Sequence, residues 1–202
     1  MDMLSDQLRV HQMLPRIATL GPGKRFVIWT QGCRRRCPGC ITPESWPMTG
    51  GRSIPVSEIA EKILSDAGCD GITISGGEPF LQARALVRLT DLLHEVRDIG
   101  VIVYTGYTLE ELKSEAAPAD SPELLKRIDL LIDGTFEQAL DDGGSLRGSS
   151  NQRILPLTDR YLQDLHLYGQ PGKRETEVRM TPEGFFVAGI PSEEIVRMKR
   201  NG

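Results

Sequence analysis

The sequence predicts an α/β protein in which a mainly parallel sheet is followed by a C-terminal β-hairpin. Two observations lead to this fold class. Short apolar runs alternate with helical repeats from Gly21 onward, and the alternation stops after Ile154. The length of 202 residues agrees, since it suits one α/β domain with an appendage and is shorter than the roughly 250 residues of a complete eight-unit barrel.

Four apolar runs have the length and the β-branched or aromatic content of buried strands. They cover residues 25–30, 71–75, 101–104 and 130–132. Between them, apolar residues at helical spacing predict helices over residues 56–67 and 83–96. Thr108 and Glu111 have the spacing of a capping box, and Ser121 followed by Pro122 predicts a further helix start with Ser121 as the N-cap. Strands that alternate with helices form βαβ units, whose strands run parallel.

The change of pattern near residue 154 predicts two parts, a sheet domain over residues 1–154 and an appendage over residues 155–202. A connector with a short helix at residues 159–167 is expected first, because Pro156, Pro171 and Gly172 interrupt any regular element. Residues 175–180 and 185–188 then have the composition of two hairpin strands around a turn.

Composition excludes several functional classes. The 24 basic and 28 acidic residues give a net charge of −4, so no overall positive field argues for a nucleic-acid partner. The longest uncharged stretch, residues 99–109, is shorter than the roughly 18 apolar residues that a bilayer span needs. The N-terminal region carries Asp2 and Asp6 and lacks the apolar segment of a secretory signal. A cytoplasmic enzyme or binding domain without a membrane partner is therefore expected.

Three of the four cysteines lie within eight residues, in the sequence Cys33-Arg-Arg-Arg-Cys37-Pro-Gly-Cys40. Clustered thiols in a chain that is neither short nor secreted more often hold a metal or perform redox chemistry than form disulfides. Zinc usually takes four ligands, and no histidine lies near this cluster in the sequence. Three thiolates on a short loop suit a four-iron cluster with one iron open to a small molecule, while zinc or a redox thiol set is the alternative.

Polar or glycine-rich turns follow each predicted strand. The cysteines follow the first strand, Gly76-Gly77-Glu78-Pro79 the second, Thr105-Gly106-Tyr107 the third, and Asp133-Gly134 the fourth. Because the C-terminal ends of parallel strands lie at one edge of a sheet, these four features are expected to converge on one ligand site. The two glycines let a ligand approach the backbone, and Glu78 offers a carboxylate for an ammonium group.

The cysteine spacing together with the Gly-Gly-Glu-Pro turn resembles the radical S-adenosylmethionine (radical SAM) superfamily. More narrowly, residues 21–152 resemble the activating enzymes of anaerobic ribonucleotide reductase. The matching segments are Gly21-Pro-Gly23, Gly32 to Cys40, Trp46, Ser75 to Pro79, Thr105 to Tyr107, Asp133-Gly134 with Phe136, and Arg147 to Gln152. Gly39 stands where many superfamily members have an aromatic residue, although these activating enzymes also have glycine there. Residues 155–202 have no counterpart in the short activating enzymes.

The resemblance implies a partial, open βα barrel and a [4Fe–4S] cluster held by the thiolates of Cys33, Cys37 and Cys40. The open iron would chelate the amino and carboxylate groups of S-adenosylmethionine. The residues implied to contact this cofactor are Gly76, Gly77 and Glu78 at its methionine end and the backbone of Gly39, Cys40 and Ile41 at its adenosyl end. One electron then cleaves the cofactor to methionine and a 5′-deoxyadenosyl radical, which takes a hydrogen atom from a glycine of a large partner enzyme.

Several neighbouring residues have two interpretations. Arg34, Arg35 and Arg36 either attract an acidic electron donor such as flavodoxin or ferredoxin or form a solvated loop. Tyr104 either contacts the cofactor or packs within its strand. Asp133 either hydrogen-bonds the cofactor ribose or the substrate, or ends its strand before Gly134.

Three functions compete at this point. The first is a glycyl-radical-activating enzyme, and the second is a radical SAM enzyme that acts directly on a small molecule or peptide, with the C-terminal appendage closing its pocket. The third is a non-enzymatic iron–sulfur electron carrier, which has no need for an open iron beside a Gly-Gly-Glu-Pro turn.

Overall fold

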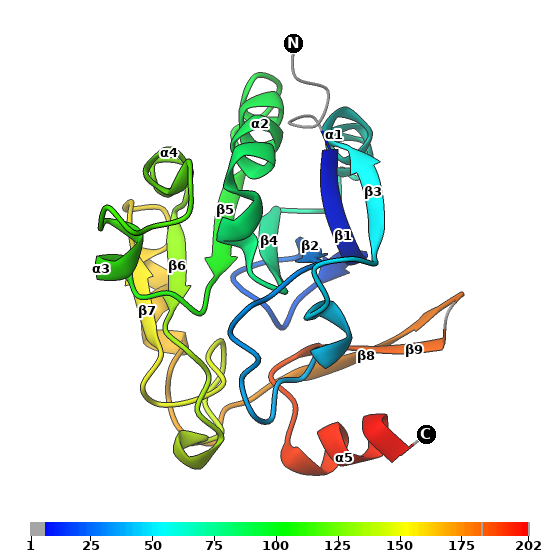
Figure 1. The fold of residues 1–202 in the computed structure, drawn as a ribbon, viewed down its shortest axis with the longest axis vertical. Helices are drawn as coiled ribbons and strands as arrows, with labels where there is room; N and C mark the ends of the chain where they lie inside the picture. Colours follow the sequence, from blue (N-terminus) through cyan, green and yellow to red (C-terminus); the bar gives the residue numbers. More distant parts are fainter. Residues whose placement is uncertain (1–6, 183, 202) are drawn as a thin grey trace.

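One seven-stranded sheet organises the protein (Figure 1). The computed structural model describes residues 7–182 and 184–201, and in them the strand order is β3-β1-β2-β4-β5-β6-β7. The strands are β1 (Gln7–Ile17), β2 (Arg25–Thr30), β3 (Arg52–Pro55), β4 (Gly71–Gly76), β5 (Gly100–Tyr104), β6 (Leu130–Asp133) and β7 (Arg153–Pro156). Strands β8 (Thr176–Thr181) and β9 (Gly184–Gly189) form a separate hairpin.

The four central strands, β2, β4, β5 and β6, run parallel to one another. In register, Ile28 of β2 lies beside Ile74 of β4, which lies beside Val103 of β5. Strands β1, β3 and β7 are antiparallel to their neighbours at the two sides. The predicted α/β class with a mostly parallel sheet and a C-terminal hairpin is confirmed, and closure into a partial barrel stays a prediction.

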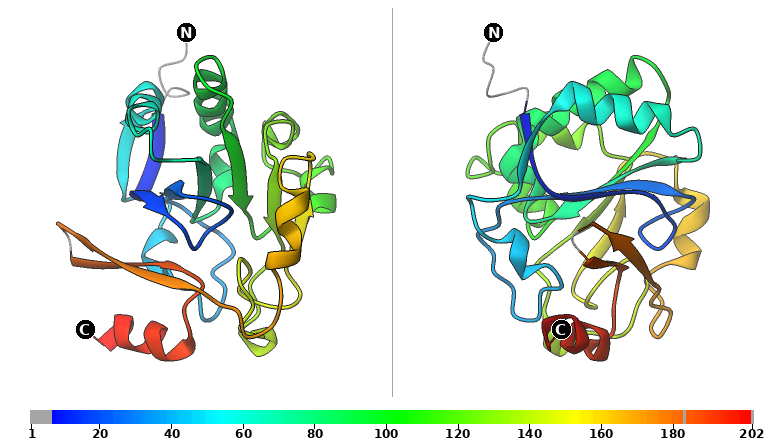
Figure 2. Two further views of the ribbon diagram at one scale, coloured as in Figure 1. Left: turned by 180° about the vertical axis from the view of Figure 1, so that it is seen from behind. Right: turned by 90° about the vertical axis from the view of Figure 1, so that its right-hand side faces the viewer.

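Helices α1 (Val56–Ser65) and α2 (Ala83–His94) cover one face of this sheet, and the hairpin lies on the other (Figure 2). Alternate strand residues such as Ile28, Ile74 and Val103 share a buried core with Ile63 of α1 and Leu89 of α2. In the described part of the chain, no helix has both the length and the apolar character needed to cross a bilayer. The helices are α1 (Val56–Ser65), α2 (Ala83–His94), α3 (Leu109–Leu112), α4 (Ser121–Leu125) and α5 (Glu193–Asn201), with short 3-10 turns η2 (Pro43–Ser45), η3 (Pro79–Gln82), η4 (Gln138–Leu140) and η5 (Leu162–Leu167).

The hairpin is fixed to the second face by apolar packing and by its charged side chains. Phe186 of β9 packs edge-on against Trp29 of β2, with ring centroids 4.6 Å apart. Glu177 of β8 accepts hydrogen bonds from the backbone N–H groups of Ala18 and Thr19, at 2.6 and 3.2 Å. The C-terminal segment is therefore packed against the sheet that carries the predicted ligand site.

Three strands and one α-helix of the described chain were absent from the sequence prediction: β1, β3, β7 and α5. Strand β1 lacks a clean two-residue repeat, because its register with β2 shifts between Val10 and Gln12 and again between Leu14 and Ile17. Strand β7 spans the predicted boundary at residue 154 and pairs with β6. The capping box of α3 is confirmed, whereas α4 has Asp120 rather than Ser121 as its N-cap.

Candidate active site

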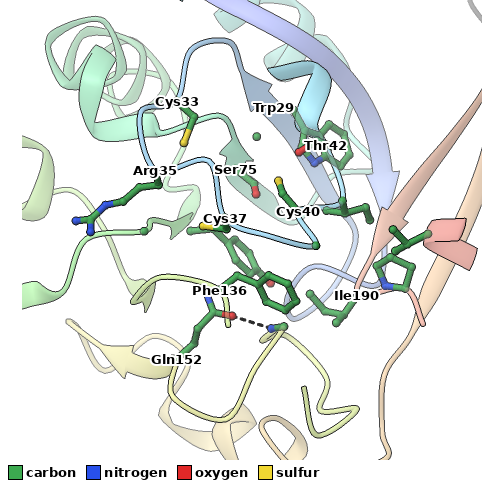
Figure 3. A pocket seen from close by; sticks show the side chains of 18 of the residues that line it. Trp29, Cys33, Arg35, Cys37, Cys40, Thr42, Ser75, Phe136, Gln152 and Ile190 are labelled. Carbon is green, nitrogen blue, oxygen red and sulfur yellow. Dashed lines mark hydrogen bonds between the residues drawn. The ribbon is translucent and has the colours of Figure 1, made fainter. Parts of the chain in front are cut away.

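A cavity of about 250 Å³ lies at the C-terminal ends of β2, β4, β5 and β6 (Figure 3). Its walls come from the cysteine loop (residues 31–42), from the turns after β4, β5 and β6, and from the C-terminal segment. The four strand-end features therefore converge on one edge as the sequence predicts. Of the predicted site residues, those that line the cavity are Cys33, Cys37, Gly39, Cys40, Ile41, Gly76, Gly77, Glu78 and Tyr104.

Backbone hydrogen bonds hold the cysteine loop, both within it and to the segment that follows it. Gly32 and Cys33 donate N–H groups to the carbonyls of Ser45 and Trp46, at 2.7 and 3.0 Å, and Cys40 donates to Cys37 at 3.1 Å. Gly39 has a φ of +80°, which an L side chain rarely adopts. A Cβ there would also lie 2.7 Å from the side-chain oxygen of Gln138, so this loop conformation favours glycine at position 39.

The three thiols suit a metal cluster. All three are free of disulfides, Cys33 is buried, and Cys37 and Cys40 are half-buried. Burial is the main reason that the pKa values of Cys33 and Cys37 are raised, and coordination to iron would instead favour the thiolates. In residues 7–182 and 184–201, no three His, Cys, Asp or Glu side chains are placed to hold a single ion. A four-iron cluster needs no such convergence, because each thiolate binds its own iron.

Gly76, which ends β4, and Gly77, which follows it, allow a close backbone contact that the sequence did not reveal. A Cβ on Gly77 would lie 2.4 Å from the carbonyl oxygen of Gly32, and one on Gly76 would lie 2.4 Å from the N atom of Thr30. Gly77 donates its N–H to the Thr30 carbonyl at 2.8 Å, and Glu78 donates to the Gly32 carbonyl at 2.8 Å. Because Gly76 and Gly77 have no side chains, the turn after β4 can form these backbone hydrogen bonds with the end of β2 and the cysteine loop.

Glu78 places a buried carboxylate in the cavity wall. Its side chain is 2% exposed and accepts hydrogen bonds from the Phe80 N–H, the Thr105 hydroxyl and the Gly106 N–H, at 3.1, 2.8 and 2.8 Å. Burial raises its pKa to about 6, and these hydrogen bonds partly oppose that rise. A carboxylate has about four acceptor sites, so capacity for one further donor remains.

Phe136 lies on the turn after β6, beside Cys37 and Gly39, and its ring lines the cavity (Figure 3). The turn is fixed by Gln152, which donates to the Gly134 carbonyl at 2.9 Å and accepts from the Gly148 N–H at 2.9 Å. Asn151 donates to the Thr135 carbonyl at 2.8 Å in the same way. The segment from Arg147 to Gln152 therefore positions this ring, a role that the motif alone did not reveal.

The side chains of Tyr104 and Asp133 lie in different environments. Tyr104 lines the cavity, and its buried hydroxyl has no hydrogen-bond partner within the described chain. Burial raises the pKa of this hydroxyl well above its ordinary value. Asp133 is not among the lining residues, because its buried carboxylate accepts the Leu109 N–H at 2.7 Å and pairs with the Arg153 guanidinium. The structure therefore does not bring Asp133 to the ligand site, and its carboxylate joins α3 to β7 instead.

The three arginines of the cysteine loop separate into two groups. Arg35 lies over the Tyr107 ring at 4.3 Å and pairs with Glu111 at 3.0 Å, so it ties the loop to the turn after β5. Arg34 and Arg36 are exposed beside the cysteines. Of the three, these two are the exposed ones.

Part of the cavity wall comes from residues that sequence reasoning missed. Val187, Ile190, Pro191 and Val196 face the cavity from β9, from the turn after it and from α5. Ile190 stands across the cavity from the cysteine loop (Figure 3). The apolar run from Phe185 to Ala188 signals a buried strand, but nothing in its spacing indicates which surface it covers.

Comparison with known proteins agrees with this geometry. The profile of the family described as "4Fe-4S single cluster domain" matches residues 19–155. The anaerobic ribonucleoside-triphosphate reductase-activating protein of Salmonella typhi is 33% identical over 156 residues, which are 73% of this chain and 97% of that protein. The protein of the same name from Vibrio cholerae serotype O1 is 34% identical over 161 residues, covering 75% of this chain and 99% of its own.

A second kind of activating enzyme is also similar. The pyruvate formate-lyase-activating enzyme of Clostridium pasteurianum is 32% identical over 129 residues, 61% of this chain and 50% of that enzyme. The part of the chain that matches the family profile, residues 19–155, contains the cysteine loop and the strand ends that build the cavity. The chain therefore belongs to the 4Fe-4S single cluster domain family and is an activating enzyme of the radical SAM type.

Proposed function

We propose that this enzyme installs a radical on a glycine of an anaerobic ribonucleotide reductase. One observation carries the proposal: Cys33, Cys37 and Cys40 line the same cavity as the Gly76–Glu78 turn. Thiolates for a cluster and a strand end suited to an amino-acid ligand thus meet in one place. The relatives named as reductase-activating proteins support the choice of partner.

In this proposal the three thiolates hold a [4Fe–4S] cluster. When bound, the cluster supplies the electron that cleaves S-adenosylmethionine to methionine and a 5′-deoxyadenosyl radical, and a hydrogen atom from the partner's glycine completes 5′-deoxyadenosine. The protein's part is to hold the cofactor against the cluster, to place the partner's glycine within reach and to keep water away.

Glu78 binds the cofactor's ammonium group in this account. A cation beside the carboxylate favours its charged form, so binding lowers the pKa of Glu78 from its raised value near 6. Gly76 and Gly77 lie next to it at the methionine end, while the backbone of Gly39, Cys40 and Ile41 faces the adenosyl end.

Two further side chains belong to the adenosyl end. The unpartnered Tyr104 hydroxyl is available to a polar group of the ligand, since a buried hydroxyl without a partner is costly. The Phe136 ring gives the adenine a flat apolar wall.

Electrons come from an acidic protein such as flavodoxin or ferredoxin, for which Arg34 and Arg36 are the exposed positive groups beside the cluster. Such a donor agrees with the cytoplasmic location that the sequence predicts.

The proposal is tested by adding the reductase to the reconstituted, chemically reduced enzyme and S-adenosylmethionine. It predicts that 5′-deoxyadenosine forms rapidly only with the reductase and that a glycyl radical appears on the reductase by paramagnetic resonance. Formation that depends instead on a small metabolite, without a protein radical, would contradict it and favour a radical enzyme acting on that metabolite.

A further inference from the structure

The two faces of the C-terminal hairpin differ in charge and in exposure to solvent. In an antiparallel pair, directly opposed residues share a face. One face carries Phe186 and Ala188, which are buried against the sheet, opposite Arg179 and Glu177. The other face is built from six uncharged residues: Thr176, Val178, Met180, Phe185, Val187 and Gly189.

The uncharged face begins in the cavity and continues along the hairpin into solvent. Val187 and Gly189 line the cavity, and Val187 is 8% exposed. Its partner Val178 is 58% exposed, and the next pair, Met180 and Phe185, is 73% and 72% exposed. We call these three exposed residues the apolar strip. Figure 1 shows the hairpin extending beyond the sheet, with α5 on the side away from α1 and α2.

We propose that the apolar strip binds the segment of the partner protein that carries the hydrogen-donating glycine. The inference rests on the proposed function and adds the surface that selects the partner. A glycine within a polypeptide enters a cavity with chain on both sides of it, so its segment needs a binding surface at the mouth. The strip supplies one because it continues the cavity wall outward by two residues of β9, about 7 Å.

The chemistry of the strip defines the segment that fits. It offers three large apolar side chains and no charge, so it binds an uncharged segment with apolar residues near its glycine. A small substrate held within the cavity would leave the strip in water. The strip also lies outside residues 19–155, the part that matches the family profile, which places partner selection on a segment added to the shared catalytic part.

The test compares the wild type with the double variant Met180→Ser/Phe185→Ser and with Val178→Lys. Val96→Ser is the matched control, since Val96 is 70% exposed and follows α2, away from the cavity. Each protein is loaded with its cluster and titrated with the anaerobic ribonucleotide reductase of its own organism. Binding affinity, glycyl radical yield and 5′-deoxyadenosine formed without a partner are measured.

The double variant and Val178→Lys are expected to bind the reductase at least about tenfold more weakly, because apolar contacts of this size are lost. Radical yield at limiting reductase falls in parallel, while partner-free 5′-deoxyadenosine formation and the Val96→Ser control stay at wild-type values. Wild-type affinity in both strip variants would overturn the inference and leave the proposed function standing. A wild type that cleaves S-adenosylmethionine but neither binds nor activates the reductase would overturn both.

Discussion

Replacing Phe186 with alanine is expected to release the C-terminal hairpin from the sheet while the sheet stays folded. The Phe186 side chain is 7% exposed and packs edge-on against Trp29, with ring centroids 4.6 Å apart. Burying such a side chain contributes about 1.5–3 kcal/mol, and an aromatic pair adds about 0.5–1.5 kcal/mol. The substitution therefore removes about 2–4.5 kcal/mol from the docking of the hairpin.

A loss of docking free energy of this size is expected to release the hairpin, while the sheet stays folded. A two-stranded hairpin is marginally stable alone, and about 2 kcal/mol already shifts the docked-to-released ratio about 30-fold. The core beneath α1 and α2 contains neither Phe186 nor Trp29, so its packing is unaffected. The cavity loses the wall formed by Val187 and Ile190, and affinity for S-adenosylmethionine is expected to fall.

Hydrogen exchange of the backbone amides measures this release. Amides of residues 176–189 are expected to exchange much faster in Phe186→Ala, while those of β4 and β5 keep their protection. Phe185→Ala is the matched control, because the neighbouring ring is 72% exposed on the opposite face of the hairpin. Unchanged protection of the hairpin in Phe186→Ala, or equal loss in the hairpin and the central strands, would refute the reasoning.

Three further predictions concern the site and its support. Gly39→Ala is expected to destabilise the protein by about 1 kcal/mol or more and to weaken cofactor binding, since φ is +80° there; calorimetric titration with S-adenosylmethionine and urea unfolding measure both effects. The pKa of Glu78 is raised from 4.5 to about 6, so its ionised form costs about 2 kcal/mol of stability. Between pH 4.5 and about 6 the Glu78 carboxyl is protonated in the folded state and ionised in the unfolded state, so the free energy of unfolding falls as the pH rises through this range. Glu78→Gln should remove that fall in urea unfolding. Arg25→Met is expected to destabilise the protein by about 3 kcal/mol or more in the same assay, because buried Arg25 donates to the Ile72 and Gly100 carbonyls and to the Tyr161 hydroxyl. Wild-type stability in Arg25→Met, or a Glu78→Gln variant with the same pH dependence as wild type, would contradict these assignments.

The central strands and the meeting of the strand ends follow from local sequence. Runs such as residues 101–104 are apolar on both faces, and βαβ connections place the C-terminal ends of the parallel strands at one edge. Those two facts predict that the cysteines, the Gly76–Glu78 turn and Tyr104 meet at one edge of the sheet, and all of them line the cavity.

The features that the sequence did not predict depend on contacts between segments far apart in the chain. Strand β1 pairs with β2 despite Pro15 and two register shifts, so its pattern lacks the repeat that marks a strand. Asp133 lies at the C-terminal end of a strand, as a ligand-binding residue would, yet its carboxylate pairs with Arg153, twenty residues later. The sequence raised a C-terminal appendage that closes the pocket only within the second function, and the fold shows that β9 and α5 are the elements that line the cavity.

The paramagnetic resonance spectrum of the reduced, reconstituted enzyme, recorded with and without S-adenosylmethionine, tests the central claim most directly. The account predicts a four-iron signal that changes when the cofactor is added, because the cofactor binds the iron that has no cysteine ligand. Cys37→Ala, which removes one of the three thiolates, is expected to lose both the signal and its response. A fully assembled cluster whose spectrum is the same with and without the cofactor would contradict the account.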